Sequence, residues 1–191
     1  EGVVFCCFNN SYKLNPRSMG RALDILGQVS GSVLWLLSGP GRADERLRAF
    51  ASDRGVDPGR LVFMAKQPHA VYMSRLQLAD LFLDTNPYSA HTTASDALWA
   101  GCPVLTCPGE TFAGRVAGSL NHHLGMQAMN VRNDDEFIAR AVHLALDPKA
   151  LAEVREALVD RRARSGVFDM AGFAADFASA IRAMAASRES R

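Results

Sequence analysis

The chain has 191 residues, of which 48% are hydrophobic and 21% are charged, a composition typical of one soluble globular domain with a full core. Its formal net charge is only +1, from 21 basic and 20 acidic residues. Such a balance produces no broad positive field, so we expect no binding to nucleic acid or to a membrane surface through overall charge. Any anion site must be local.

No stretch reaches the ~18 uninterrupted apolar residues of a membrane-spanning helix, so we expect no membrane span. The cysteines Cys6, Cys7, Cys102 and Cys107 all lie in or beside predicted buried strands, and none belongs to a C-x-x-C pair. We interpret them as small core residues of a cytoplasmic protein and expect no metal site. The first strand follows Glu1 almost at once, and from this we expect a piece of a longer protein.

Strands and helices alternate along the first half of the chain. Residues 3–8 form an apolar run typical of a strand buried on both faces. Asn15 and Pro16 then start a helix, as its N-cap and its first residue. Hydrophobic periodicity predicts the elements that follow, namely strand 33–37, helix 43–54, strand 61–64, a helix within 65–79 and strand 81–83.

The second half continues the alternation and then becomes helical. Glu110 is expected in the first turn of its helix, and Asn133 and Pro148 are expected to start two more helices. The predicted elements are a helix opening at 91–93, strand 103–107, helix 110–124, a short strand 128–131, helix 134–146, a helix from 148 and helix 169–184, followed by a polar tail expected to fray. The fold class is therefore α/β, a Rossmann-like, doubly wound parallel sheet.

The loop before the helix at 91–93 leaves the carboxyl edge of the sheet, where parallel sheets bind ligands. The helix start offers unpaired N–H groups and a partial positive charge, so we expect a phosphate there, beside His91, Thr92 and Thr93. An alternative stays open, because Thr93 and Asp96 fit the spacing of a capping box, which would make both residues structural.

Five segments carry a resemblance to a known family. They are FCCFNNSYKLNP (5–16), SVLWLL (32–37), QLADLFLDT (77–85), HTTASDALWAG (91–101) and PGETFAGRVAGS (108–119). In order and spacing they resemble the C-terminal catalytic half of the O-linked N-acetylglucosamine transferases and their SPINDLY relatives. The resemblance implies the nucleotide-sugar-binding half of a GT-B fold, with residues 1–168 as the UDP-sugar-binding domain and 169–191 as a C-terminal helix and tail.

The resemblance also implies a reaction. The whole enzyme would move N-acetylglucosamine from UDP-GlcNAc to serine or threonine hydroxyls of proteins, without a metal or another cofactor. The acceptor protein or peptide would bind through an N-terminal half, and helical TPR repeats would lie upstream. Two alternatives remain open, a nucleotide-binding or scaffold module without activity of its own and a nucleotide-sugar epimerase-like enzyme.

The resemblance implies ten site residues, with Lys13 as the catalytic one. Residues that agree with the family's UDP-sugar site are Lys13, Arg75, His91, Thr92, Thr93 and Asp96. Residues that align with it but depart from the animal enzymes are Asn10, Gln67, His69 and Tyr72. From the residues alone, Lys13 could equally be a solvated loop lysine, and His69, Tyr72 and Arg75 an ordinary helix face.

The last helix has an apolar stripe of four residues at helical spacing, Phe173, Phe177, Ile181 and Met184. Two interpretations are open. The stripe packs on its own domain, or it needs a partner beyond the main sheet. The second interpretation predicts that the isolated chain self-associates through this helix.

Overall fold

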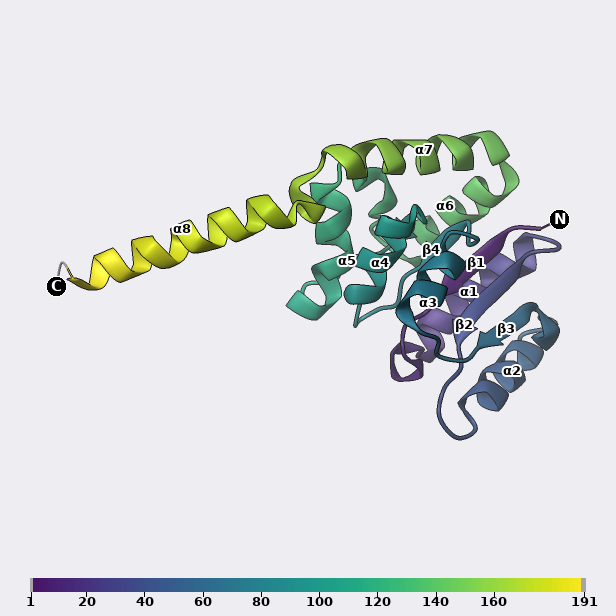
Figure 1. Cartoon of the computed structure of the whole chain (residues 1–191). Coiled ribbons are helices and arrows are strands. Elements are labelled where there is room, and N and C mark those ends of the chain that lie inside the picture. The colour runs from purple at the N-terminus through teal and green to yellow at the C-terminus, as the bar shows by residue number, and fades with distance from the viewer. Residues whose placement is uncertain (1, 190–191) are drawn as a thin grey trace.

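The computed structural model describes residues 2–189, and it is built around one five-stranded sheet in which every ladder is parallel (Figure 1). The strands are β1 (Val4–Cys7), β2 (Val33–Leu37), β3 (Leu61–Met64), β4 (Leu81–Leu83) and β5 (Val104–Leu105), in the order β3-β2-β1-β4-β5. The helices are α1 (Pro16–Gln28), α2 (Ala43–Asp53), α3 (His69–Leu76), α4 (Thr92–Ala100), α5 (Phe112–His123), α6 (Asp134–Leu146), α7 (Pro148–Arg164) and α8 (Met170–Glu189). The predicted α/β class and parallel sheet are confirmed.

The centre of the sheet is occupied by β1, where Cys6 pairs with Trp35 of β2 and with Phe82 of β4. The chain runs outward from β1 through β2 to β3, then returns to place β4 on the other side of β1. The loops after β1 and β4 therefore diverge. In open α/β sheets such a switch point forms a crevice at the carboxyl ends of the strands, and ligands bind there.

The helix starts follow the local chemistry of the sequence. Asn15 caps α1 by accepting a hydrogen bond from the Ser18 N–H at 2.9 Å, and Pro16 takes the first helical position. Asn133 caps α6 in the same way, at 2.9 Å from the Glu136 N–H. The inner side of α1 is buried, including Met19, Leu23, Leu26 and the following Val29. All four cysteines are buried and free, as small core residues.

Three predicted boundaries around the last strand are wrong. Only Val104–Leu105 of 103–107 is regular strand, and the expected strand at 128–131 is a 3-10 turn, Gln127–Met129, followed by one bridge between Thr106 and Asn130. Glu110 lies outside α5, because Thr111 is the N-cap and accepts from the Gly114 N–H. The regular strand ends here, where the chain bends and Asn130 Nδ2 donates to the Gly118 carbonyl oxygen at 2.9 Å.

Helix α8 extends away from the body of the molecule (Figure 1). It continues to Glu189, beyond the predicted end at 184, so the expected fraying from residue 185 is wrong as far as 189, and residues 190–191 lie outside the described residues. The apolar stripe is exposed along its whole length, comprising Phe173, Phe177, Ile181 and Met184. Packing of the stripe on its own domain, the first of the two interpretations, is therefore wrong.

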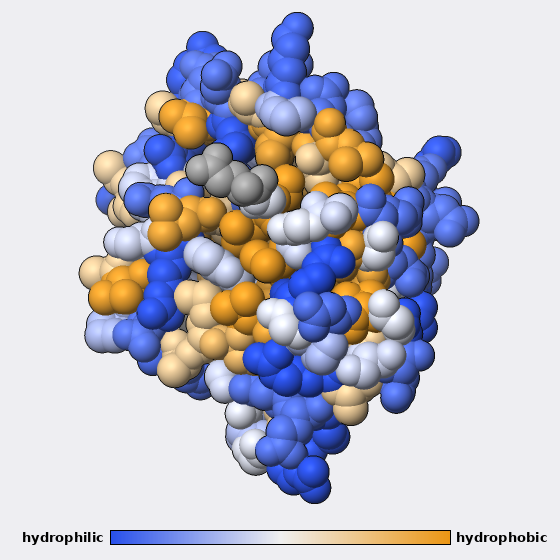
Figure 2. Space-filling view, turned by 90° about the vertical axis from the view of Figure 1, so that its right-hand side faces the viewer, coloured by the Kyte–Doolittle hydropathy of each residue, from blue (hydrophilic) through white to orange (hydrophobic). Residues whose placement is uncertain are grey.

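Figure 2 shows the molecule from another side, near the N-terminus, where hydrophobic residues are mixed with hydrophilic ones.

Candidate functional site

The loops that diverge after β1 and β4 are tied together by Asn9. Its Nδ2 donates to Thr85 Oγ1 at 2.8 Å, and its Oδ1 accepts from Thr93 Oγ1 at 2.6 Å. Asn9 is buried, so both bonds are shielded from water. One side chain thus fixes the loop after β4 and the first turn of α4 against the end of β1.

Lys13 ends a short 3-10 helix, Ser11–Lys13, that follows β1, and its side chain turns back into the protein. Its Nζ donates to the Ser89 carbonyl oxygen at 2.8 Å and lies 3.7 Å from the centroid of the Tyr88 ring. The side chain is not solvated, because the residue is only 9% exposed. Burial lowers the pKa of Lys13, and the nearby Asp84 carboxylate opposes that shift.

Asp84 shapes the loop that receives Lys13. Its Oδ1 accepts from the Thr85 N–H at 2.8 Å and from the Ala90 N–H at 2.6 Å, and its Oδ2 accepts from Thr106 Oγ1 at 2.7 Å. Burial raises the pKa of this carboxyl group to about 6, although these hydrogen bonds and Arg21 oppose the shift. At neutral pH the group is therefore a carboxylate held by three donors, and it closes the loop from 84 to 90 into a fixed shape.

Helix α4 begins at Thr92, with His91 in the N-cap position. The predicted capping box of Thr93 and Asp96 is wrong, because Thr93 donates its hydroxyl to Asn9 and the Asp96 carboxylate lies 3.6 Å from His69 Nε2. The box cannot form because Thr93 is already inside the first turn. The helix start is instead flanked by two hydroxyls and by the His91 ring, whose Nε2 lies 3.2 Å from the Ala113 carbonyl oxygen.

A cavity of about 300 Å³ lies at the carboxyl ends of β1, β2 and β3, between them and helices α3 and α4. It brings together five of the ten predicted site residues, Asn10, Gln67, Tyr72, Arg75 and Thr93, with Phe8, Leu37, Met64, Ala65 and Lys66. The walls are largely apolar, and the Phe8 and Tyr72 rings meet edge to face at 5.8 Å. Cavities with apolar walls and a few polar groups are typical of small-molecule sites.

The Tyr72 hydroxyl has an unusual environment. Its oxygen is buried and has no hydrogen-bond partner among the described residues. Burial raises the pKa of Tyr72, so the hydroxyl keeps its proton and remains a donor. A buried polar group without a partner is costly to the free protein.

The other five predicted residues lie outside that cavity. Lys13, His91 and Thr92 lie around the start of α4. His69 is exposed at the start of α3, with its Nε2 3.6 Å from the Asp96 carboxylate of α4 and its ring 6.0 Å from that of Tyr72. The ten residues thus form two neighbouring groups along one edge of the sheet, joined by Thr93.

Sequence reasoning missed several residues of this edge. Asp84 directly follows β4 and Asn9 lies two residues after β1, a signal that could have found them. Three aromatic residues come from separate segments: Tyr88 lies against Lys13 and His91, Phe112 of α5 against His91, and Tyr12 against Tyr88. No local pattern shows that these rings meet, because the fold brings them together.

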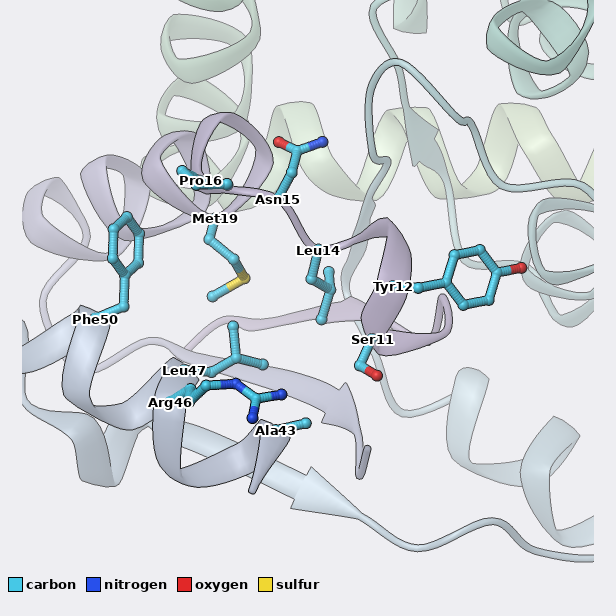
Figure 3. Close-up of a pocket in the computed structure, with 10 residues that line it drawn as sticks. All are labelled: Ser11, Tyr12, Leu14, Asn15, Pro16, Met19, Ala43, Arg46, Leu47 and Phe50. Atoms are coloured by element: carbon cyan, nitrogen blue, oxygen red, sulfur yellow. The ribbon is translucent and has the colours of Figure 1, made fainter. Parts of the chain in front are cut away.

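A second cavity, of about 370 Å³, lies between the start of α1 and helix α2 (Figure 3). Leu14, Met19 and Leu47 point toward one another there, and Tyr12 turns away from them. None of the ten predicted site residues lines this cavity. We assign it no ligand.

Between residues 2 and 189 no helix is both long and apolar enough to cross a membrane. Within the same part of the chain, no three or more His, Cys, Asp or Glu side chains are gathered as a metal site requires.

The chain is similar to known proteins over nearly its whole length. Residues 1–177 match the model of glycosyl transferase family 41. A Caenorhabditis elegans UDP-N-acetylglucosamine–peptide N-acetylglucosaminyltransferase is 37% identical over 176 residues, which are 92% of this chain and 15% of that protein. A probable Arabidopsis thaliana transferase of the same name, SEC, is 38% identical over 170 residues, 88% of this chain and 17% of that protein.

The similarity extends to solved structures. A mutant of the Thermobaculum terrenum O-GlcNAc transferase superposes with a TM-score of 0.88 at 32% identity, over 96% of this chain and 36% of that one. The Staphylococcus aureus TarM structure, at 8% identity and a TM-score of 0.57, shares the fold alone. The chain thus spans less than a fifth of the two curated relatives and about a third of the bacterial structure. On these matches and this sheet, the chain has the fold of one half of a GT-B glycosyltransferase and belongs to glycosyl transferase family 41.

Proposed function

We propose that this chain is the donor-binding half of a glycosyltransferase that moves N-acetylglucosamine from UDP-GlcNAc to serine or threonine hydroxyls of proteins. The observation that carries the proposal is the continuity of the 300 Å³ cavity with the start of α4, which share Thr93 at the switch point of the sheet. The names of the relatives, peptide N-acetylglucosaminyltransferases, support this substrate class.

The 300 Å³ cavity suits the nucleoside part of the proposed UDP-GlcNAc donor. Its apolar wall, with Phe8 and Met64, fits the flat face of a base, and Asn10 and Gln67 offer hydrogen bonds for its edge or for the ribose. Arg75 adds a positive charge at the cavity wall. His69, outside the cavity, closes its rim next to Tyr72 and Asp96.

The start of α4 suits the diphosphate. Its first N–H groups and the hydroxyls of Thr92 and Thr93 are donors at the positive end of the helix. Lys13 supplies the full positive charge. An ammonium has three donors, so the bond to Ser89 leaves Lys13 able to bind a phosphate oxygen as well.

The chemical task is to stabilise the UDP leaving group while the glycosidic bond breaks. Negative charge grows on the distal phosphate, and donors that are already in place there act more strongly in the transition state than in the ground state. We assign this role to Lys13 as the catalytic residue, with His91, Thr92 and Thr93 beside it. In this mechanism neither a metal ion nor another cofactor takes part.

The other proposed partners are the acceptor and further parts of the whole protein, which lie in those parts of the relatives that this chain does not cover. The bacterial relative has almost two thirds of its chain outside the matched part, and we propose that the protein or peptide acceptor binds there, in a half that completes the cleft. The exposed stripe of α8 then packs on another polypeptide surface, and in the isolated chain it does so by self-association. Helical repeats upstream belong to the same proposal. The four free, buried cysteines support the cytoplasm as the compartment.

Calorimetry with the purified chain tests this proposal. The chain is expected to bind UDP weakly and more tightly than ADP, and to transfer no sugar to peptide alone. Binding of ADP as tight as that of UDP would refute the nucleotide assignment. Transfer by the chain alone would refute the division of labour between two halves. No observation favours the scaffold module or the epimerase-like enzyme, and the relatives' names point to transfer.

A further inference from the structure

Helix α5 borders an open, largely apolar groove of about 580 Å³, which we call the α5 groove. It is lined by Pro108, Phe112, Arg115, Val116, Gly118, Ser119, Leu120 and Asn130. The residues at positions 112, 115, 116 and 119 have the spacing of one helix face. None of the ten predicted site residues lines the groove, so the proposed nucleotide site does not explain it.

Helix α8 carries an apolar surface of matching length. Its stripe of Phe173, Phe177, Ile181 and Met184 is exposed, and the exposed Met170 extends the same face to the first residue of the helix. From Met170 to Met184 the stripe is about 21 Å long, and the 12 residues of α5 rise by about 18 Å. A helix of this kind can lie along a groove of this length.

The groove and the stripe of one chain do not meet. Helix α8 leaves the body beside α5 and extends away from it (Figure 1). The segment before α8 holds this direction, since Ser165 Oγ donates to the His123 carbonyl oxygen of α5 at 3.3 Å. The occupant of each groove therefore comes from outside its own chain. A second copy of the chain supplies the matching stripe.

The charges beside the two surfaces are complementary. Arg115 lines the α5 groove, and Asp176 flanks the stripe as the only carboxylate of α8 before Glu189. Neither Arg115 nor Asp176 forms an ion pair with another described residue. Charges of opposite sign at the rim of a contact favour one partner and one orientation.

We propose that the α5 groove is the docking site for α8 of a second copy of this chain, with Asp176 of one copy facing Arg115 of the other. In a two-fold dimer each copy gives its α8 and receives that of its partner, so the same contact forms twice. This inference rests on the self-association in the proposed function and adds the surface at which it occurs. It does not depend on UDP binding.

A mixing experiment tests the exchange of helices. Ser119→Glu places a charge in the groove, and Phe177→Glu places one in the stripe. By light scattering, each variant alone should associate at least about 10-fold more weakly than the wild type, because an unpaired charge is buried at an apolar contact. An equal mixture should form heterodimers, since one variant keeps an intact stripe and the other an intact groove.

His122→Glu is the matched control, because His122 is exposed on the same helix but lies outside the α5 groove. It should associate like the wild type. A Ser119→Glu chain that also associates like the wild type would overturn the proposal and show that two α8 stripes pair with each other. A mixture that stays monomeric, or a monomeric wild type, would overturn it as well.

Cross-linking identifies the contact directly. A chain with Phe177→p-benzoylphenylalanine is irradiated together with an isotopically labelled wild-type chain. The cross-linked peptides should join α8 of the first to residues 108–120 of the labelled chain. Cross-links between two α8 helices would overturn the proposal.

Calorimetry separates this inference from the nucleotide site. Ser119→Glu should bind UDP like the wild type, and a large loss of UDP affinity in this variant would contradict a groove that is independent of the nucleotide. Absence of UDP binding by a wild type that still exchanges helices would refute the nucleotide assignment and leave the docking site standing.

Discussion

The ammonium of Lys13 donates to the carbonyl oxygen of Ser89 at 2.8 Å, a contact between residues 76 positions apart in the chain. It joins the loop after β1 to the loop after β4, across the switch point of the sheet. The Tyr88 ring covers the same ammonium at 3.7 Å. The positive charge of Lys13 is thus fixed in place before any ligand arrives, as a group that stabilises a transition state must be.

Replacement of Lys13 should affect turnover more than binding. In the whole protein that carries this chain, Lys13→Ala is expected to lower kcat on the order of 10²-fold, because a preorganised donor to the leaving phosphate is lost. KM for UDP-GlcNAc should change less. Lys13→Arg should recover little, since a planar guanidinium cannot occupy the place of a compact ammonium. Steady-state kinetics with a peptide acceptor measure both constants.

The matched control is Lys149→Ala, which removes an exposed lysine on α7 that pairs with Glu153 at 3.9 Å. It should turn over like the wild type. A kcat of Lys13→Ala within about threefold of the wild type would remove this lysine from the mechanism and leave the start of α4 to stabilise the diphosphate.

The buried Asp84 should make stability depend on pH. Its pKa is raised from 3.8 to about 6 by burial, so the folded protein binds the proton more tightly than the unfolded chain. The stability from this group is present below pH 3.8 and is lost as pH rises through 6. A shift of about two pKa units limits this loss to about 3 kcal/mol in the free energy of unfolding. The charged and titratable groups that face this carboxylate are Arg21, Lys13 and Cys7.

Asp84→Asn isolates that contribution. An asparagine Oδ1 can accept from the Thr85 and Ala90 N–H groups as the carboxylate does, and its Nδ2 can donate to Thr106 Oγ1. Urea unfolding of both proteins at several values between pH 4 and pH 8 should show the wild type losing stability relative to Asp84→Asn as pH rises. A difference that stays constant with pH would contradict the raised pKa.

Removal of the Tyr72 hydroxyl should stabilise the free chain. Tyr72→Phe deletes a buried hydroxyl that has no partner among the described residues, so the free energy of unfolding should rise by about 1 kcal/mol. Tyr12→Phe, which removes an exposed hydroxyl outside the 300 Å³ cavity, should leave stability unchanged. Urea unfolding measures both variants. A Tyr72→Phe chain that is less stable than the wild type would contradict the absence of a partner.

The exposed stripe of α8 should make the isolated chain associate. Phe173 and Phe177 stack at 6.0 Å on the surface of a helix that extends from the body. Light scattering should show a molar mass that rises with concentration for the wild type. Phe177→Glu should stay monomeric, and Ala175→Glu, on the opposite face of α8, should behave like the wild type. A wild type that is monomeric at high concentration would contradict self-association.

Local chemistry in the sequence was enough to predict most of the elements. The N-caps Asn15 and Asn133 and the helix-starting Pro16 act within three residues of themselves, so their effect is visible in a short window. The strands β2 and β3 were predicted to the residue, because each is a continuous run of apolar side chains. The alternation of strands with helices predicted the parallel sheet, and with it the edge at which ligands bind.

Tertiary structure alone decided the interior of the site. In the sequence a capping box of Thr93 and Asp96 was an open alternative, but the Thr93 hydroxyl donates instead to Asn9, 84 residues away. The unpartnered hydroxyl of Tyr72 and the packing of Tyr88 and Phe112 against His91 likewise depend on which strands become neighbours. Such contacts join residues far apart in the chain. They are set by the packing of the whole sheet, which no local pattern of residues contains.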